Sequence, residues 1–202
     1  MIEEFLWERG YSSIGGVDEA GRGPLAGPLV AACVVLPRYC YLPGVRDSKS
    51  LSPSQREKLY RETCSSSLAI GIGMVGERFI DAAGIEKANV FVFQEAIYRA
   101  SSSRFPEFLI LDWVKVPFLQ TPSLSLPQAE SKSLAVAAAS VVAKVFRDEI
   151  MENFYQPLFP HYSFSQHKGY GTSLHRREIE EWGLEDCHRL SFCRKYEKQR
   201  QG

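Results

Sequence analysis

The chain has 202 residues, 45% of them apolar, and its 24 Lys and Arg are balanced by 24 Asp and Glu. This length and composition are typical of one globular domain with a buried core, and the longest apolar runs are too short to span a bilayer. The zero net charge excludes a broadly basic protein whose composition alone would indicate nucleic-acid binding.

The first residues and the cysteines predict a cytoplasmic protein. The N-terminal stretch MIEEFLWERG has three acids and lacks the apolar segment of a signal peptide. The five cysteines are scattered, odd in number and without Cys-x-x-Cys spacing, which favours reduced thiols over disulfides or a zinc site. We therefore expect a cytoplasmic chain without a leader or membrane contact.

The first part of the chain predicts strands around a glycine-rich loop. Residues 14–18 and 29–36 are apolar and predict two strands that flank this loop. A helix is expected after Ser52, a potential N-cap, with Pro53 in its first turn. Residues 67–77 alternate in polarity and predict a third strand.

The second part of the chain adds helices and one short strand. Apolar spacing predicts a helix over 86–103, and the run FLILD at 108–112 predicts a buried strand that ends in an acid. Residues 115–129 contain three prolines and are expected to be mostly loop. Residues 132–154 and about 172–183 predict two more helices. This order favours an α/β fold with a central mixed sheet.

Acidic residues stand at the ends of two predicted strands. Asp18 and Glu19 follow the first strand, and Asp112 ends the FLILD strand. In open α/β folds, ligands bind at the carboxyl ends of the strands. Because successive strand residues point to opposite faces, Asp18 and Glu19 are expected to serve one site only if the strand breaks at Glu19.

Three carboxylates at two strand ends predict a site for hard divalent cations, Mg²⁺ or Mn²⁺. Two such ions about 4 Å apart would support phosphodiester hydrolysis. The alternative is structural, with Asp112 capping the turn that follows it.

Six sequence blocks, in the same order along the chain, resemble the signature of ribonuclease HII, the type 2 ribonuclease H. They are GVDEAGRGPLAGPLVAA, DSKSLS, LILD, AAASVVAKVFRD, HKGYGT and HRLSF. The resemblance implies a ribonuclease H-like fold, with a central mixed sheet flanked by helices. It also implies a single catalytic domain over 1–202, in which about 155–202 form a helical substrate-binding segment.

The resemblance implies an endonuclease that acts on two kinds of nucleic acid. The family hydrolyses the RNA strand of RNA–DNA hybrids and cuts 5′ of ribonucleotides embedded in duplex DNA, leaving 3′-hydroxyl and 5′-phosphate ends. The implied cofactors are Mn²⁺ or Mg²⁺, two per site. We expect the chain to act as a monomer on these substrates.

The resemblance also assigns the acids. Asp18, Glu19, Asp112 and Glu130 fall on the catalytic, metal-binding positions of the family. Two residues depart from the family pattern. Glu130 stands where an Asp is expected, which lengthens the reach of that carboxylate, and Trp113 stands where Gly is expected, which would crowd the mouth of the site.

Further residues are implied to bind substrate. Gly21, Arg22 and Gly23 match the element that reads the 2′-hydroxyl, and Tyr170 matches the residue that senses the RNA–DNA junction. Lys49 is a candidate for contact with backbone phosphates, and Lys168, beside Tyr170, is expected to bind substrate.

Other residues are given structural roles. We interpret Lys144 and Asp148 as an ion pair within a helix. The four histidines are interpreted as loop or core residues.

Ribonuclease HIII is disfavoured by the sequence, and two other functions remain open. A ribonuclease HIII would carry an additional N-terminal domain, and only about a dozen residues precede the first predicted strand here. A junction resolvase would share the fold but does not need the sugar-reading elements. An inactive nucleic-acid-binding member is the second, favoured by Glu130 and Trp113.

Overall fold

A five-stranded mixed sheet forms the centre of the computed structural model, which describes residues 1–45 and 52–197. Lys49 lies outside these residues. The strands are β1 (Ser13–Ala20), β2 (Leu29–Pro37), β3 (Ala69–Val75), β4 (Phe108–Asp112) and β5 (Ser123–Leu126), in the spatial order β3–β2–β1–β4–β5. The β1–β2 and β2–β3 pairs are antiparallel, whereas β1–β4 and β4–β5 are parallel. The predicted fold class is therefore confirmed.

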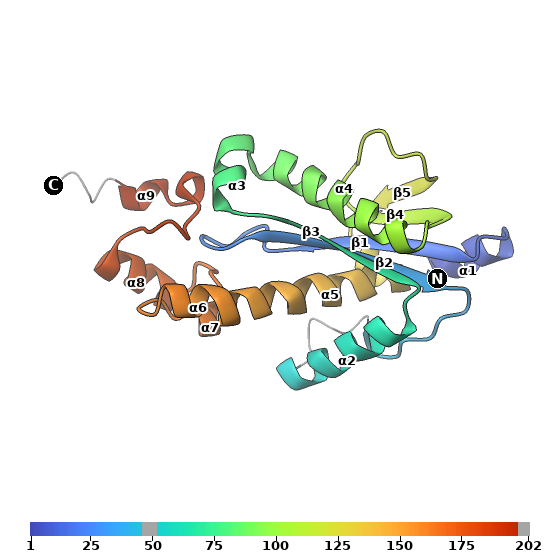
Figure 1. Ribbon diagram of the computed structural model, residues 1–202, viewed down its shortest axis with the longest axis horizontal. Helices are drawn as coiled ribbons and strands as arrows, with labels where there is room; N and C mark the ends of the chain where they lie inside the picture. The colour runs from blue at the N-terminus through green and yellow to red at the C-terminus, as the bar shows by residue number, and fades with distance from the viewer. Residues whose placement is uncertain (46–51, 198–202) are drawn as a thin grey trace.

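Helices cover both faces of the sheet (Figure 1). On one face α5 (Leu134–Ile150) packs directly against β1 and β2, with α2 (Pro53–Ser66) beside it. On the other face lie α3 (Glu77–Ala83) and α4 (Ile85–Ser103). The layers bury two separate apolar clusters because alternate strand residues face α4 or α5.

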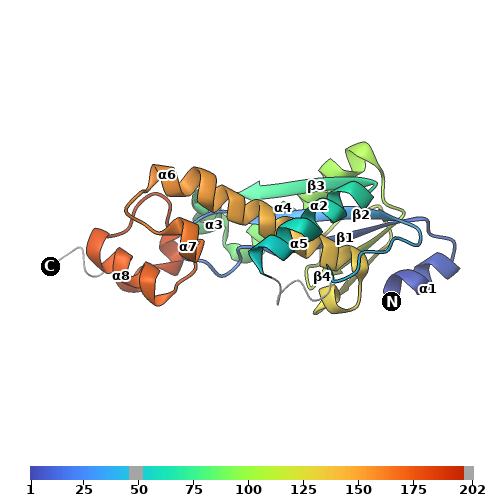
Figure 2. The ribbon, with the colours of Figure 1, turned by 90° about the horizontal axis from the view of Figure 1, so that it is seen from below.

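The C-terminal helices gather beyond one end of the sheet, opposite the short N-terminal helix α1 (Ile2–Glu8) (Figure 2). They have their own buried core, which includes Tyr162 and Phe164. The elements after α5 are a π-helical turn (Met151–Tyr155), α6 (Gln156–Leu158), α7 (Phe164–His167), α8 (Ser173–Trp182), a 3-10 turn (Leu190–Phe192) and α9 (Arg194–Glu197). Among the described helices, none combines the length and apolar character that crossing a membrane requires.

Most predicted elements are confirmed, including the helix capped by Ser52, whose side chain accepts a hydrogen bond from the backbone N–H of Gln55. Residues 115–129 are mostly loop, as expected, but they also contain β5, a short parallel edge strand that was not predicted. One expectation is wrong. The first strand does not break at Glu19: it continues to Ala20, with Glu19 paired to Ala31.

Helix α5 lies unusually close to β1 at Gly16. A Cβ atom on Gly16 would stand 2.1 Å from the carbonyl carbon of Ala135 and 2.2 Å from the backbone nitrogen of Val136. Real Cβ atoms do not tolerate such distances, so only glycine fits between the strand and the helix. This approach brings α5 close to the strand that carries Asp18.

We predict that Gly16→Ala destabilises the protein by about 1–3 kcal/mol or more, since the methyl group would force α5 away from the sheet. Urea denaturation measures this change. Gly76→Ala is the matched control: a Cβ atom on Gly76 would meet no other atom within 4 Å, and a cost of about 1 kcal/mol or less is expected at this N-cap position. Equal costs for the two variants would contradict the prediction.

Candidate active site

Two of the predicted acids leave neighbouring parallel strands at the same edge of the sheet. Val17 of β1 is paired with Leu111 of β4, and the next residues are Asp18 and Asp112. Asp18 lies on the α5 face, where its carboxylate is hydrogen-bonded to the Ser140 side chain. Asp18 and Asp112 therefore lie at the same edge of the sheet, as the sequence predicted.

Burial makes Asp18 difficult to ionise. Its side chain is only 7% exposed, and loss of water raises the pKa of the carboxyl well above its usual range. The negative charges of Glu19 and Asp112 raise the pKa further. The Ser140 hydrogen bond and the backbone N–H of Glu19, 2.8 Å from Oδ1, act in the opposite direction.

Glu19 points to the opposite face of β1, as strand alternation requires. Its carboxylate is hydrogen-bonded to Asn89 of α4 and lies 4.0 Å from Nη1 of Arg22. Burial raises the pKa of Glu19, and Asp112 raises it further. Because Asp112 acts on both carboxyls, the two acids share one site across the strand, and no break in β1 is needed.

Asp112 also organises the segment that carries Glu130. Its Oδ1 accepts a hydrogen bond of 2.7 Å from the backbone N–H of Ala129, at the start of the short 3-10 helix Ala129–Ser131. The contact holds the Glu130 segment at the end of β4. This contact joins Asp112 to a segment 17 residues later, so it is not the expected cap of the turn directly after Asp112, and it is compatible with a second role.

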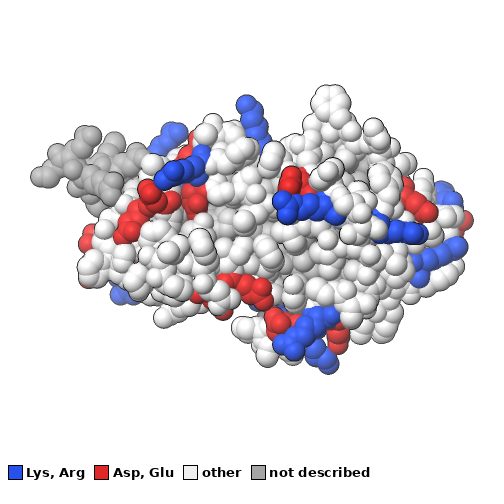
Figure 3. All heavy atoms as spheres, in the orientation of Figure 1, with Lys and Arg blue, Asp and Glu red and all other residues white. Residues whose placement is uncertain are grey.

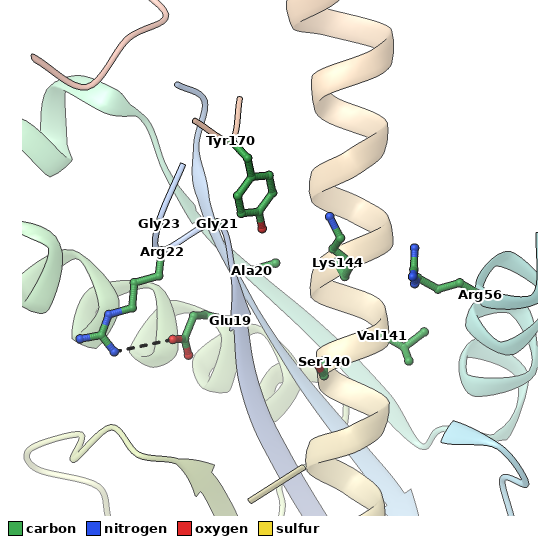
Figure 4. Close-up of a pocket in the computed structure, with 10 residues that line it drawn as sticks. All are labelled: Glu19, Ala20, Gly21, Arg22, Gly23, Arg56, Ser140, Val141, Lys144 and Tyr170. Carbon is green, nitrogen blue, oxygen red and sulfur yellow. Dashed lines mark ion pairs between the residues drawn. The ribbon is translucent and has the colours of Figure 1, made fainter. Parts of the chain in front are cut away.

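A hollow of about 420 Å³ opens next to these acids (Figure 4). Its walls come from the end of β1, the following loop, α2, α5 and the loop before α8. They are formed by Glu19, Ala20, Gly21, Arg22, Gly23, Arg56, Ser140, Val141, Lys144 and Tyr170. Four predicted residues outside the acids, Gly21, Arg22, Gly23 and Tyr170, thus meet in one place.

Tyr170 stands beside basic groups at this hollow. The centre of its ring lies 5.3 Å from Nζ of Lys144 and 5.4 Å from Cζ of Arg147. Lys144 also makes the predicted ion pair with Asp148, at 2.7 Å. On the face shown in Figure 3, basic and acidic side chains are interspersed, so the positive charge at the hollow is local.

Two buried arginines hold the loop after β1. Arg189 donates to the carbonyl oxygens of Gly21, Arg22 and Gly27 over 2.7–3.2 Å. Arg147 donates to the carbonyls of residues 26, 28 and 168 over 2.9–3.1 Å. Both side chains are fully buried. Arg147 therefore joins the 21–28 loop to the loop containing Tyr170, and Arg189 holds the 21–28 loop at further carbonyls.

The structure does not bring Lys168 into the hollow. Its ammonium group pairs with Glu152 and donates to the carbonyl oxygen of Ser165, because the left-handed backbone at Lys168, with φ of 51°, ends α7 and turns the chain. The prediction that Lys168 binds substrate at this hollow is therefore not supported.

The histidines fit the interpretation as core and loop residues. The rings of His167 and His175 stack with centres 4.1 Å apart, and Nε2 of His175 lies 3.2 Å from Nε2 of His188. Burial lowers the pKa of His175 to about 3 and that of His188 to about 4. These rings are neutral near pH 7, and neither lines the hollow.

The acids offer a partial ligand set for divalent cations. Within residues 1–45 and 52–197, no three His, Cys, Asp or Glu side chains form a group that encloses an ion by itself. However, Oε2 of Glu19 is buried without a hydrogen-bond partner, and neighbouring carboxylates raise the pKa of Asp18 and that of Glu19. A cation would relieve both conditions. Mg²⁺ typically takes one or two carboxylates together with water and substrate phosphates, so the donor set fits.

Comparison with known proteins identifies the family. A family model described as ribonuclease HII matches residues 15–195. The ribonuclease HII of Bacillus thuringiensis (strain Al Hakam) is 43% identical over 191 residues, which cover 95% of this chain and 73% of that protein. The chain belongs to the ribonuclease HII family. It is thus an endoribonuclease of ribonuclease H type 2, and the match does not favour a resolvase or an inactive binding protein.

Solved structures agree with this assignment. The ribonuclease H2 of Pyrococcus horikoshii OT3 has a TM-score of 0.76 and 26% identity, covering 94% of this chain and all of that one. Bst-RNase HIII in complex with Mn²⁺ has a TM-score of 0.71 and covers 95% of this chain and 71% of that one. At 20% identity the second likeness shows the fold alone. Divalent metal ions are the cofactors of this family.

The ribonuclease HII blocks contain site residues that sequence reasoning missed. Ser140 was not predicted as a site residue and Lys144 was interpreted only as an ion-pair partner, yet both line the hollow. Arg147 and Arg189 belong to the blocks FRD and HRLSF, and that match was the available signal. Arg56 of α2 carries no such signal, because it reaches the hollow only through the packing of α2 on α5.

We predict that the free energy of unfolding, measured without divalent ions, decreases as pH rises through the raised pKa of Asp18. The native state then holds an ionised carboxylate that the unfolded chain accommodates at lower cost. Asp18→Asn should remove much of this decrease. Denaturant titrations from pH 4 to pH 8 measure it.

Glu107→Gln is the control for this titration, because hydrogen bonds from Ser12 lower the pKa of Glu107. Glu107 therefore contributes stability that is lost as pH falls. Glu107→Gln should not change the separate loss of stability that accompanies rising pH. An unchanged pH profile in Asp18→Asn would contradict the prediction.

We also predict that Arg189→Lys lowers the free energy of unfolding by about 2–4 kcal/mol. A lysine keeps the charge but leaves some of the buried carbonyls unpaired, at about 1–3 kcal/mol each. Arg78→Lys, a change in a surface ion pair with Asp186, should cost under about 1 kcal/mol. Chemical denaturation measures the free energy of unfolding of both variants. If Arg189→Lys is as stable as the parent, the hydrogen bonds of Arg189 contribute little to stability.

Proposed function

We propose that this chain hydrolyses the RNA strand of RNA–DNA hybrids and cuts 5′ of single ribonucleotides in duplex DNA, leaving 3′-hydroxyl and 5′-phosphate ends. The observation that carries the proposal is that Glu19, the Gly21–Gly23 loop and Tyr170 line one hollow, at the strand end where the charges of Asp18, Glu19 and Asp112 interact. One set of residues is suited to metal-assisted hydrolysis and the other to recognition of a sugar.

The metal ligands we propose are Asp18, Glu19, Asp112 and Glu130. Two Mg²⁺ or Mn²⁺ ions held by them would stabilise the negative charge that develops on the attacking and leaving oxygens of the phosphodiester. The chain's own contribution is to hold these carboxylates close despite their repulsion. The Ser140 hydrogen bond keeps Asp18 in place, and Ala129 fixes Asp112.

The loop of residues 21–23 is proposed to recognise the 2′-hydroxyl, the group that distinguishes RNA from DNA. Gly21 has φ of 94°, and a Cβ atom there would stand 2.2 Å from Nε of Arg147. Gly23, in contrast, has open space around its Cα. The loop is thus packed on the side of the arginines and open at Gly23, where a ribose can approach the backbone.

Tyr170, Lys144 and Arg56 are proposed to position the rest of the substrate. The Tyr170 ring is 37% exposed at the hollow, where it can pack against the sugar that lacks the hydroxyl. Lys144 and Arg56 lie at the α5 and α2 walls (Figure 4), where phosphates of the duplex would pass. Such contacts add affinity without reading sequence. Fixing the sugar in this way selects which phosphate is cut.

The helical segment over about 155–202 is proposed to complete the substrate-binding surface of a single catalytic domain. It supplies Tyr170 directly and holds the 21–28 loop through Arg189. We propose that the domain works as a monomer.

The main test is cleavage of a DNA duplex that contains one ribonucleotide, with Mg²⁺ and with Mn²⁺, beside an all-DNA duplex. We expect one cut, 5′ of the ribonucleotide, and a loss of at least about 100-fold in Asp112→Asn. An Asn side chain can still accept the hydrogen bond from Ala129, so this variant should remain as stable as the parent.

Asp112→Ala separates the two roles of the carboxylate. It removes the turn contact as well, so it should lose both activity and about 1 kcal/mol of stability. If Asp112→Asn remains active, the role of Asp112 is only to accept the hydrogen bond from Ala129. Cleavage of long hybrids without cleavage at the single ribonucleotide would argue against the proposed substrate range.

A further inference from the structure

Trp113 occupies an exposed position directly after the proposed metal ligand Asp112. The side chain is 64% exposed, and its backbone has φ of 59°, a conformation that bulky residues rarely adopt. The N–H of Val114 donates to the Asp112 carbonyl at 2.6 Å, which makes a tight turn centred on Trp113. The resemblance implied glycine here. The indole is not buried in the main hollow, so the expected crowding of that hollow is absent.

A second, smaller hollow of about 180 Å³ lies at Trp113. Arg22 and Lys115 contribute positive charge to its walls, Asn89 an amide, and Glu86 one acid. Arg22 lines both hollows. The second hollow therefore adjoins the proposed active site at Arg22. It lies toward α4, the face of β1 to which Glu19 points, whereas α5 forms a wall of the first hollow.

We infer that Trp113 and Lys115 form a subsite for a nucleotide of the substrate that flanks the one read by residues 21–23, with the indole packed on that nucleotide and the ammonium near its phosphate. The inference rests on the proposed function. A single exposed aromatic residue needs no explanation by itself. Here it adjoins a metal ligand, borders a hollow and has two cations beside it, as in sites that bind nucleic-acid strands.

The test is equilibrium binding of the single-ribonucleotide duplex in EDTA, where no cleavage takes place. Trp113→Ala and Trp113→Gly should both weaken binding by about 5- to 100-fold, whereas Trp113→Phe should stay close to the parent. If the substitutions acted only through the backbone, Trp113→Ala and Trp113→Phe would bind with similar affinity. Trp113→Gly would differ from both, because glycine suits this φ. That second pattern would overturn the inference.

Truncated duplexes distinguish a contact from a structural effect. Shortening the duplex on the side that contacts Trp113 should weaken binding by the parent. The same shortening should weaken binding by Trp113→Ala much less, because that variant has already lost the contact. Equal losses of affinity in the parent and in Trp113→Ala, whichever side of the duplex is shortened, would contradict the subsite. Phe118→Ala is the matched control, because Phe118 lies in the same loop, is 99% exposed and has φ of 60°. It should bind like the parent.

Salt dependence gives an independent measurement for Lys115. Lys115→Ala should reduce the slope of log affinity against log salt concentration by about 0.7–0.9, whereas Trp113→Ala should leave it unchanged. An unchanged slope in Lys115→Ala would remove the phosphate contact from the inference. The outcome is separate from the proposed function: cleavage by the parent tests that function, and binding in EDTA tests the subsite.

Discussion

The site depends on two buried guanidinium groups that donate to backbone carbonyls. Burial lowers the pKa of Arg147 and lowers that of Arg189 to about 10, and the charge of Arg147 contributes to the second shift. The free-energy cost of burying the two charges is offset because the guanidinium groups donate hydrogen bonds to the carbonyls of two loops. The loop with Gly21–Gly23 and the loop with Tyr170 therefore form one rigid unit with the C-terminal segment.

The second constraint is the alternation of side chains along β1. Asp18 and Glu19 are adjacent in the chain, but they point to α5 and α4 respectively. The acids accordingly surround the end of the strand, and a hollow lies on each side of Arg22. A substrate bound across this strand end would contact both faces. This geometry explains why Glu19 and Asp112 can share a site although β1 continues through Ala20.

Sequence patterns predicted much of the fold because the apolar periodicities were strong. The FLILD strand and the Ala-rich helix α5 illustrate this, since each buries more than half of its residues. In contrast, β5 was missed: its SLSL pattern is short, lies between prolines and is half exposed at the sheet edge. Ser140 was not predicted as a site residue, because hydrogen bonding to Asp18 depends on how α5 rotates over β1.

The sequence by itself determined the family and the α/β class and pointed to the candidate acids, because these are recorded in local motifs and periodicities. Only the tertiary structure decided which groups act together. It paired Lys168 with Glu152, away from the hollow, and brought Lys144 and Arg56 to its walls. Such contacts join residues far apart in the chain, and their distances follow from helix packing and loop geometry, which no local pattern encodes.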